Sequence, residues 1–213
     1  MRSCRMSLTT YRIDRDGADR LLFLFHGWSA EQHHLAAYVP LVDPNERFTA
    51  VCPRAPHDLD EGDGASWYTR TPDGPEPESF LAALTVVEDF IAGEASSVGI
   101  PLERCVIGGF SQGGFLALAL AGKVGAPTFT GVWAMCCAIH QIDGLDLDFA
   151  ANAGTPALVQ VGEQDAIIDP ALGREAAAAL SDAGWAVQVE GYDMAHSQTI
   201  EMMTDARAWL AAL

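Results

Sequence analysis

Ser111 stands at the centre of the pentad 109–113, which reads Gly-Phe-Ser-Gln-Gly and matches the pattern GxSxG. A serine hydroxyl becomes a nucleophile for acyl transfer when a neighbouring base takes its proton. An apolar run, 105–108, leads into the pentad, and a run with helical spacing, 113–123, follows it. A strand, GxSxG and a helix in this order are typical of the strained turn that holds a nucleophilic serine above the end of a sheet. The pattern predicts that Ser111 is the nucleophile of a serine hydrolase; the alternative is a glycine-rich turn that only packs the helix on the sheet.

The predicted base is His196. In hydrolases built around this turn, the acid and then the histidine follow the serine along the chain. Four of the six histidines precede Ser111, and His140 comes before the strand that is expected to deliver the acid. His196 follows the last predicted strand, in a short loop ahead of a C-terminal helix. A solvent-facing histidine at the start of that helix is the alternative.

Two aspartates compete for the role of the acid that orients His196. Asp165 comes just past the end of a predicted strand, 157–161, where its carboxylate could reach the second imidazole nitrogen. Asp169 directly precedes Pro170. Aspartate before proline is typical of a helix N-cap, because the carboxylate accepts from free backbone N–H groups and proline is tolerated at the first helical position. We therefore favour Asp165 and keep Asp169 as its rival.

Backbone N–H groups are expected to stabilise the oxyanion that forms during acyl transfer. One belongs to Gln112, the residue after the nucleophile, and the other comes from the loop after an earlier strand. That loop contains Gly27, which permits a tight turn, so the N–H of Trp28 is the second predicted donor. The side chains of His26 and Trp28 are expected to shape the wall of the site, and His26 and Trp67 are tentative substrate contacts. For His26, packing and bonding to loop backbone is favoured over a role as a second base.

Strand-like and helical segments alternate along almost the whole chain. The alternation predicts an α/β fold with a doubly wound, mainly parallel sheet flanked by helices, whose sites lie at the carboxyl ends of the strands. We expect one domain over residues 1–213, because a chain of this length with 49% hydrophobic residues can bury one substantial core. The predicted strands are 21–25, 48–52, 105–108, 129–135, 157–161 and 186–189, and the predicted helices are 79–94, 113–123, 170–183 and 199–213.

Two irregular segments, 53–77 and 137–155, are each expected to leave the carboxyl end of a strand. By position they should overhang the site, and their modest length leaves little room for a large cap domain. Passive surface loops are the alternative.

The chain is strongly acidic, with 12 basic against 29 acidic residues and a formal net charge of -17. This charge repels nucleic-acid phosphates and anionic lipid surfaces, so neither nucleic acid nor stable membrane insertion is expected. It indicates a solvated surface, with a bias toward neutral or cationic substrates as the other interpretation. The start of the sequence has no apolar core of a signal peptide, and no later run approaches about 18 apolar residues, so a cytoplasmic location is predicted.

The cysteines are expected to be buried thiols. Their number is odd, none has CxxC spacing, and most lie in apolar, strand-like segments. Adjacent Cys136 and Cys137 would point to opposite faces of a strand, which argues against a metal site formed by this pair. The five cysteines are Cys4, Cys52, Cys105, Cys136 and Cys137.

Together these residues resemble the phospholipase/carboxylesterase family, which includes the acyl-protein thioesterases. The resemblance runs from residue 20 to the C-terminus. It implies an α/β-hydrolase fold without a large cap and hydrolysis of esters or thioesters without a cofactor. It also implies a triad of Ser111, Asp165 and His196, with oxyanion donors at Trp28 and Gln112. The segments that carry it are His-Gly-Trp at 26–28, Cys-Pro-Arg-Ala-Pro at 52–56, Ser-Trp-Tyr at 66–68, Gly-Phe-Ser-Gln-Gly-Gly at 109–114, Gly-Glu-Gln-Asp at 162–165 and Met-Ala-His-Ser at 194–197.

Two departures from the family pattern bear on the substrate. Family members commonly carry HGLGD in the oxyanion loop and valine-proline after the acid, whereas this chain has His-Gly-Trp-Ser-Ala at 26–30 and Asp-Pro at 169–170. A tryptophan at position 28 could close the tunnel that a long acyl chain needs. We therefore predict that an acyl-enzyme on Ser111 hydrolyses small carboxylic esters or thioesters, with short-chain or aromatic groups.

Other functions stay open at this point. They are a lysophospholipase or acyl-protein thioesterase acting on longer acyl chains, a serine peptidase or amidase on the same fold, and a binding protein that has kept the scaffold without catalysis. A small-molecule ester or thioester is the expected partner, and a homodimer is left open.

Overall fold

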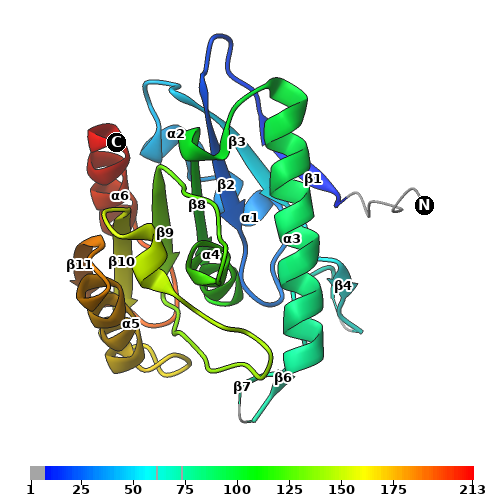
Figure 1. The fold of residues 1–213 in the computed structure, drawn as a ribbon, viewed down its shortest axis with the longest axis vertical. Helices are drawn as coiled ribbons and strands as arrows, with labels where there is room; N and C mark the ends of the chain where they lie inside the picture. The colour runs from blue at the N-terminus through cyan, green and yellow to red at the C-terminus, as the bar shows by residue number, and fades with distance from the viewer. Residues whose placement is uncertain (1–7, 61, 73) are drawn as a thin grey trace.

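The computed structural model describes residues 8–60, 62–72 and 74–213. A seven-stranded sheet with the order β1-β3-β2-β8-β9-β10-β11 runs through its centre (Figure 1). Six strands are parallel, and β1 pairs antiparallel with β3 at one edge. The predicted mainly parallel α/β sheet is therefore confirmed. The strands are β1 (Thr10–Ile13), β2 (Arg20–Phe25), β3 (Phe48–Pro53), β8 (Cys105–Phe110), β9 (Gly131–Met135), β10 (Pro156–Gly162) and β11 (Ala186–Tyr192).

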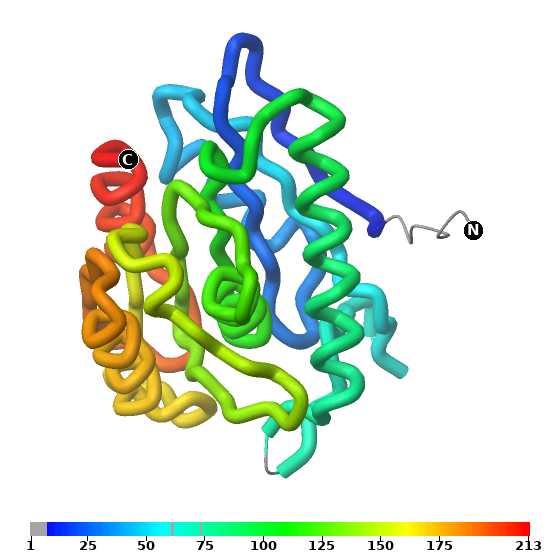
Figure 2. Tube along the Cα trace, in the orientation of Figure 1, coloured from blue at the N-terminus to red at the C-terminus, as the bar shows by residue number. Residues whose placement is uncertain are grey.

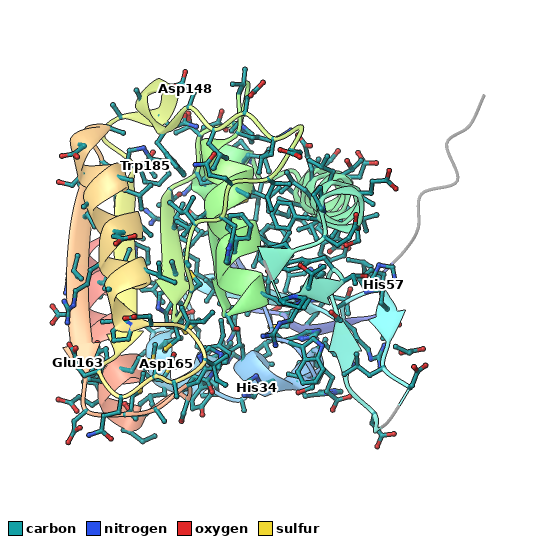
Figure 3. The ribbon with its side chains drawn as sticks, turned by 90° about the horizontal axis from the view of Figure 1, so that it is seen from below. His34, His57, Asp148, Glu163, Asp165 and Trp185 are labelled. Atoms are coloured by element: carbon teal, nitrogen blue, oxygen red, sulfur yellow. The ribbon has the colours of Figure 1, made fainter. Side chains whose placement is uncertain are left out.

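Helices cover both faces of this sheet, as Figure 3 shows in a view roughly along the strands. One face carries α3 (Pro77–Val98), α4 (Gln112–Gly122) and α5 (Pro170–Asp182), and the other carries α1 (His33–Ala36), α2 (Val39–Val42) and α6 (Ile200–Ala212). Successive side chains of a strand point to opposite faces, so the central strands supply both cores. In β2, for example, Leu21, Phe23 and Phe25 pack on the α4 side, whereas Leu22 and Leu24 pack on the α6 side.

The pattern of buried residues in each helix follows from its position against the sheet. Every residue of α4 is buried, as expected of a helix that is apolar all round and lies against the middle of the sheet. In α5 only one face is buried, with the spacing i, i+3, i+4, i+7 of an amphipathic surface helix; this face consists of Gly173, Ala176, Ala177 and Leu180. No described helix has the length and apolar character that crossing a bilayer requires.

Some elements were not predicted. Strand β1 has no buried residue, so its sequence lacks the apolar run that marks the central strands. Helices α1 and α2 have four residues each, too few for a periodic pattern to be read. The remaining short elements are β4 (His57–Asp58), β5 (Ala65–Ser66), β6 (Arg70–Thr71) and β7 (Gly74–Pro75), with 3₁₀ turns at Leu102–Arg104 and Phe149–Asn152.

The direction of chain winding reverses between β2 and β8. From β2 the chain goes outward to β3 on one side and then returns to place β8 on the other side. At such a reversal the loops that leave two neighbouring parallel strands diverge to opposite faces, which leaves a crevice at their carboxyl ends. The loop that starts at His26 leaves β2 there, and Ser111 directly follows β8.

Candidate active site

Ser111 occupies a strained turn between β8 and α4. Its backbone has φ 55° and ψ -115°, and its N–H donates to the carbonyl of Met135 at 2.9 Å. A positive φ at a residue other than glycine costs of order 1–3 kcal/mol, and such strain concentrates at functional sites. Strand β8 on one side and the buried helix α4 on the other hold the turn in this conformation.

The glycines of the pentad allow the turn to approach the neighbouring strand. A Cβ on Gly113 would lie 2.0 Å from the carbonyl oxygen of Phe25, and one on Gly109 would lie 2.3 Å from the carbonyl carbon of Gly113. Side chains at these positions would therefore push the first turn of α4 away from β2. The close approach brings Ser111 and the loop after β2 into one site.

His196 and Asp165 form a direct pair. The Nδ1 of His196 lies 2.6 Å from Oδ2 of Asp165, and the other carboxylate oxygen accepts from the backbone N–H groups of Ile167 and Ile168 at 2.8 and 2.9 Å. The side chain of Asp165 is 1% exposed and that of His196 is 16% exposed. Figure 3 shows Asp165 on the loop between β10 and α5. The carboxylate is thus fixed in orientation, and the imidazole is left within reach of solvent.

Asp169, the rival acid, has a different place. Its carboxylate accepts from the N–H of Ala171 at 2.9 Å, which makes it the N-cap of α5, with Pro170 as the first helical residue. The structure therefore pairs His196 with Asp165 and uses Asp169 to begin a helix.

Phe110 links Ser111 to His196. It precedes Ser111, and its ring packs against the imidazole of His196 with 4.6 Å between centroids. Among the described residues, no hydrogen bond joins Ser111 Oγ to His196; the contact that relates the two residues is this ring packing. Catalytic hydrogen bonds of this kind often shorten only once a substrate is bound.

The two predicted oxyanion donors are available for a ligand. Gln112 is the first residue of α4, where a backbone N–H has no partner within the helix. Neither this N–H nor that of Trp28 donates to another group within the described ranges. The side chain of Gln112 anchors a neighbouring segment: it accepts from Trp67 N–H at 3.1 Å and donates to the carbonyl of Tyr68 at 2.9 Å.

The tentative substrate contacts His26 and Trp67 prove to be buried supports of the oxyanion loop, with 1% and 0% exposure. His26 Nδ1 pairs with the carbonyl of Gly27 at 2.7 Å, and its Nε2 accepts from Ala55 N–H at 3.0 Å. Trp67 donates from Nε1 to the carbonyl of His26 at 2.7 Å. Burial lowers the pKa of His26 to about 4, so its imidazole is neutral at neutral pH. The favoured interpretation of His26 as a packed histidine is confirmed.

A cavity of about 250 Å³ opens on Ser111. Both irregular segments contribute to it, the first through the hairpin of β6 and β7 and the second through residues 137–140, so they overhang the site as expected. Figure 2 shows these segments meeting near the start of α3. The lining residues include Tyr68, Arg70, Gly74, Pro75, Gln112, Phe115, Cys137, Ala138, His140, Ile167, Ile168 and Leu172.

The side chain of Trp28 does not line this cavity, contrary to the expectation that it shapes the wall and closes an acyl tunnel. It is 47% exposed, and the guanidinium of Arg70 lies over its ring at 5.7 Å. The indole instead lines a neighbouring cavity of about 450 Å³, which shares Tyr68, Arg70 and Thr71 with the first. Within the cavity that opens on Ser111, any limit on acyl length therefore comes from other side chains.

Several side-chain contacts of the site were not predicted from the sequence. Phe110 and Gln112 belong to the segment 109–114 that carries the family resemblance, but the packing of one ring and the hydrogen bonds of the other side chain were not expected. His140, excluded as the base by chain order, lines the cavity; its ring packs edge-on against Phe115 at 5.0 Å, and burial lowers its pKa. These placements depend on contacts between elements that are distant in sequence.

The described cysteines are free and buried, as predicted. Cys136 packs in the core on the α6 side and Cys137 in the core on the α4 side, so the adjacent pair does point to opposite faces. Burial raises the pKa of Cys136 to about 12, with the nearby Asp165 carboxylate adding to the effect. Cys4 lies outside the described residues.

The sheet, its flanking helices and a serine on a strained turn after a central strand define the α/β-hydrolase class. Within that class, the family model for Phospholipase/Carboxylesterase matches residues 13–213. The chain therefore belongs to the phospholipase/carboxylesterase family and is a hydrolase of the carboxylic ester kind.

Known proteins agree with this assignment. Acyl-protein thioesterase 1 of Kluyveromyces lactis is 29% identical over 219 residues, which cover 91% of this chain and 92% of that protein. The carboxylesterase of Bacillus cereus has a similar structure, with a TM-score of 0.84 and 18% identity over 97% of this chain and 95% of that one. Esterase PE8 has a TM-score of 0.82 and 22% identity over 96% of this chain and 98% of that one. At these identities the two structures show the fold alone.

Proposed function

We propose that this protein is a serine carboxylesterase that hydrolyses small esters or thioesters, with short-chain or aromatic acyl groups, through an acyl-enzyme on Ser111. One observation carries the proposal: a cavity of about 250 Å³ opens on a serine in a strained turn beside a paired histidine and aspartate. The proposal includes a cytoplasmic location and catalysis by the residues of the chain alone.

The proposed mechanism uses the pairing of His196 with Asp165. With Nδ1 as the donor to the Asp165 carboxylate, the second ring nitrogen, Nε2, is the one that can accept a proton. In the proposed mechanism Nε2 takes the proton of Ser111 as its Oγ attacks the acyl carbonyl, and Asp165 stabilises the charged imidazole. The same proton passes to the leaving alcohol or thiol, and a water molecule then repeats the sequence on the acyl-enzyme.

The tetrahedral intermediates carry a negative charge on the former carbonyl oxygen. The N–H groups of Trp28 and Gln112 are the donors proposed for that oxygen, because neither has a partner among the described residues. The buried contacts of His26 and Trp67 hold the loop that contains the first donor. Removing one such donor from a hydrolase costs about 10²–10³ in kcat.

The size of the cavity supports a small acyl group. Pockets for drug-sized ligands commonly span about 300–1,000 Å³, and this cavity of about 250 Å³ is smaller. Phe115, Ile168 and Leu172 provide apolar walls, and the rings of Phe115 and His140 pack together within the lining. An acyl chain of the length found in membrane lipids would extend beyond this cavity.

Ser111→Ala tests the nucleophile. We expect kcat for a p-nitrophenyl ester to fall on the order of 10⁶-fold, because no other group can form the acyl-enzyme. Labelling by a fluorophosphonate, which reacts with activated serines, should disappear in the same variant. Ser97→Ala is the matched control, since this serine is exposed on α3 and bonds within its own helix. A Ser111→Ala protein that keeps a tenth of the activity would exclude the mechanism.

A series of p-nitrophenyl esters from acetate to palmitate tests the acyl group. We expect kcat/KM to be highest for short or aromatic acyl groups and to fall as the chain outgrows the cavity. A maximum at laurate or beyond would reject the small-substrate proposal and favour the alternative suggested by the thioesterase name of the Kluyveromyces lactis relative.

A further inference from the structure

A thiol lies beside the acid and base of the site and has no part in the proposed mechanism. Cys136 directly follows β9, and its sulfur, an imidazole nitrogen of His196 and a carboxylate oxygen of Asp165 all lie within 4.8 Å of one another. Cys136 is 2% exposed and Asp165 is 7% exposed. The imidazole is the most exposed of the three groups, so solvent reaches the cluster from its side.

The backbone holds this thiol in place. Cys136 has φ 45°, a left-handed conformation that is rare for residues other than glycine, and its N–H donates to the carbonyl of Gln160 at 2.8 Å. Its Sγ lies 3.8 Å from the carbonyl of Ser197, the residue after the base. A strained residue that directs sulfur to the acid and base is a second specialised turn in the site, in addition to the turn at Ser111.

The three side chains offer sulfur, nitrogen and oxygen, which is a common ligand set for Zn²⁺. In proteins this ion binds cysteine, histidine and carboxylate ligands at about 2.0–2.3 Å and often keeps water in a fourth position. Its ligand atoms then lie roughly 3–4 Å apart, so separations of up to 4.8 Å in the observed cluster must shrink by roughly 1–2 Å, and the 2.6 Å between Nδ1 and Oδ2 must lengthen. The side chain that we expect to move is that of His196, because it is the most exposed of the three.

We propose that Cys136, Asp165 and His196 form a binding site for a thiophilic divalent cation, represented by Zn²⁺, and that the bound cation inhibits the enzyme. The cation bonds to Sγ, to Nδ1 and to a carboxylate oxygen. The thiol proton leaves to solvent, and the imidazole proton moves from Nδ1 to Nε2. Nε2 then carries a hydrogen and cannot accept the proton of Ser111, so the nucleophile is not activated. Binding stands independently of the proposed function, whereas inhibition rests on it.

Cobalt binding tests the site without any assay of activity. Metal-free full-length protein titrated with Co²⁺ should develop the near-ultraviolet absorption of a thiolate bound to cobalt, at one ion per chain, and Zn²⁺ should displace it. The band should be lost in Cys136→Ala and kept in Cys52→Ala, which removes another buried thiol from β3. The absence of the band in the unmodified protein, or its persistence in Cys136→Ala, would overturn the proposal.

Inhibition is measured on the same proteins with a short-chain ester. We expect Zn²⁺ to inhibit the enzyme reversibly, with activity recovered when a chelator is added. In Cys136→Ala, half-inhibition should require at least about tenfold more Zn²⁺, whereas kcat without metal should be unchanged. The factor is at the low end of the 10–100-fold loss caused by removing even an outer-shell partner of a metal site. A cobalt band without inhibition would refute the inhibitory part of this proposal alone, whereas the proposed mechanism is tested separately by the loss of activity in Ser111→Ala.

Discussion

The buried His26 should make the stability of the protein sensitive to acid. Its imidazole donates from one nitrogen to the carbonyl of Gly27 and accepts at the other from Ala55 N–H. Only the neutral ring can do both, because a protonated imidazole has no acceptor. Burial is the main reason that its pKa falls to about 4. Protonation would therefore break the contact with Ala55 and loosen the loop that carries Trp28.

The sign and size of the effect follow from this pKa. In the unfolded chain His26 has its ordinary pKa of 6.5, so between pH 6.5 and about pH 4 the unfolded state binds more protons than the folded state. The contribution to stability is complete above pH 6.5 and is lost as the pH falls through this window. A difference between pKa values of 6.5 and about 4 corresponds to about 3 kcal/mol of unfolding free energy.

Urea denaturation at a series of pH values from 7 to 4 measures the loss. His26→Gln removes the titrating ring and keeps an acceptor for Ala55 N–H, so it should be less stable at pH 7 but lose about 3 kcal/mol less over the window. His57→Gln is the matched control, because His57 is exposed on β4 and its replacement should leave the pH profile unchanged. Parallel profiles for the unmodified protein and His26→Gln would refute the argument.

Three further predictions concern the site and its support. Asp165→Asn should lower kcat about 10⁴-fold, because the amide favours the wrong imidazole tautomer. Asp169→Ala should lower the unfolding free energy by about 1 kcal/mol and leave kcat unchanged. Equal losses of kcat in the two variants would contradict the assignment of Asp165 as the acid. Gly113→Ala should lower the unfolding free energy by about 3 kcal/mol, since its Cβ would meet the Phe25 carbonyl at 2.0 Å. A thermal unfolding midpoint equal to that of the unmodified protein would refute this prediction. Trp28→Ala should keep kcat for a short-chain ester within about threefold, because the proposed donor is the backbone N–H; a loss near the 10²–10³ expected for a missing oxyanion donor would show that the indole contributes.

The sequence by itself determined the layout of the molecule. A strand that is buried on both faces appears in the sequence as a short, continuous apolar run. A surface helix that is buried on one face appears as apolar residues with helical spacing. The pentad at 109–113 predicted a strained turn. Its glycines are needed there because a Cβ on Gly113 would collide with the carbonyl of Phe25. The interpretation of Asp169 as a helix N-cap is confirmed, since an N-cap has a local signature, and Asp165 is the aspartate that pairs with His196. Strand β1 was not predicted, because an edge strand without buried residues has no apolar run in its sequence.

The tertiary structure decided which side chains face the cavity. Trp28 and Trp67 are both tryptophans in motifs near the site, yet one is 47% exposed and the other fully buried, because one loop turns outward and the other packs beneath it. In the segment that follows β9, His140 reaches the cavity wall and Cys136 reaches the pair of Asp165 and His196. Such contacts join residues tens of positions apart, as in the pair of Asp165 and His196 at a separation of 31. They depend on strand order and loop direction, which local residue patterns do not encode.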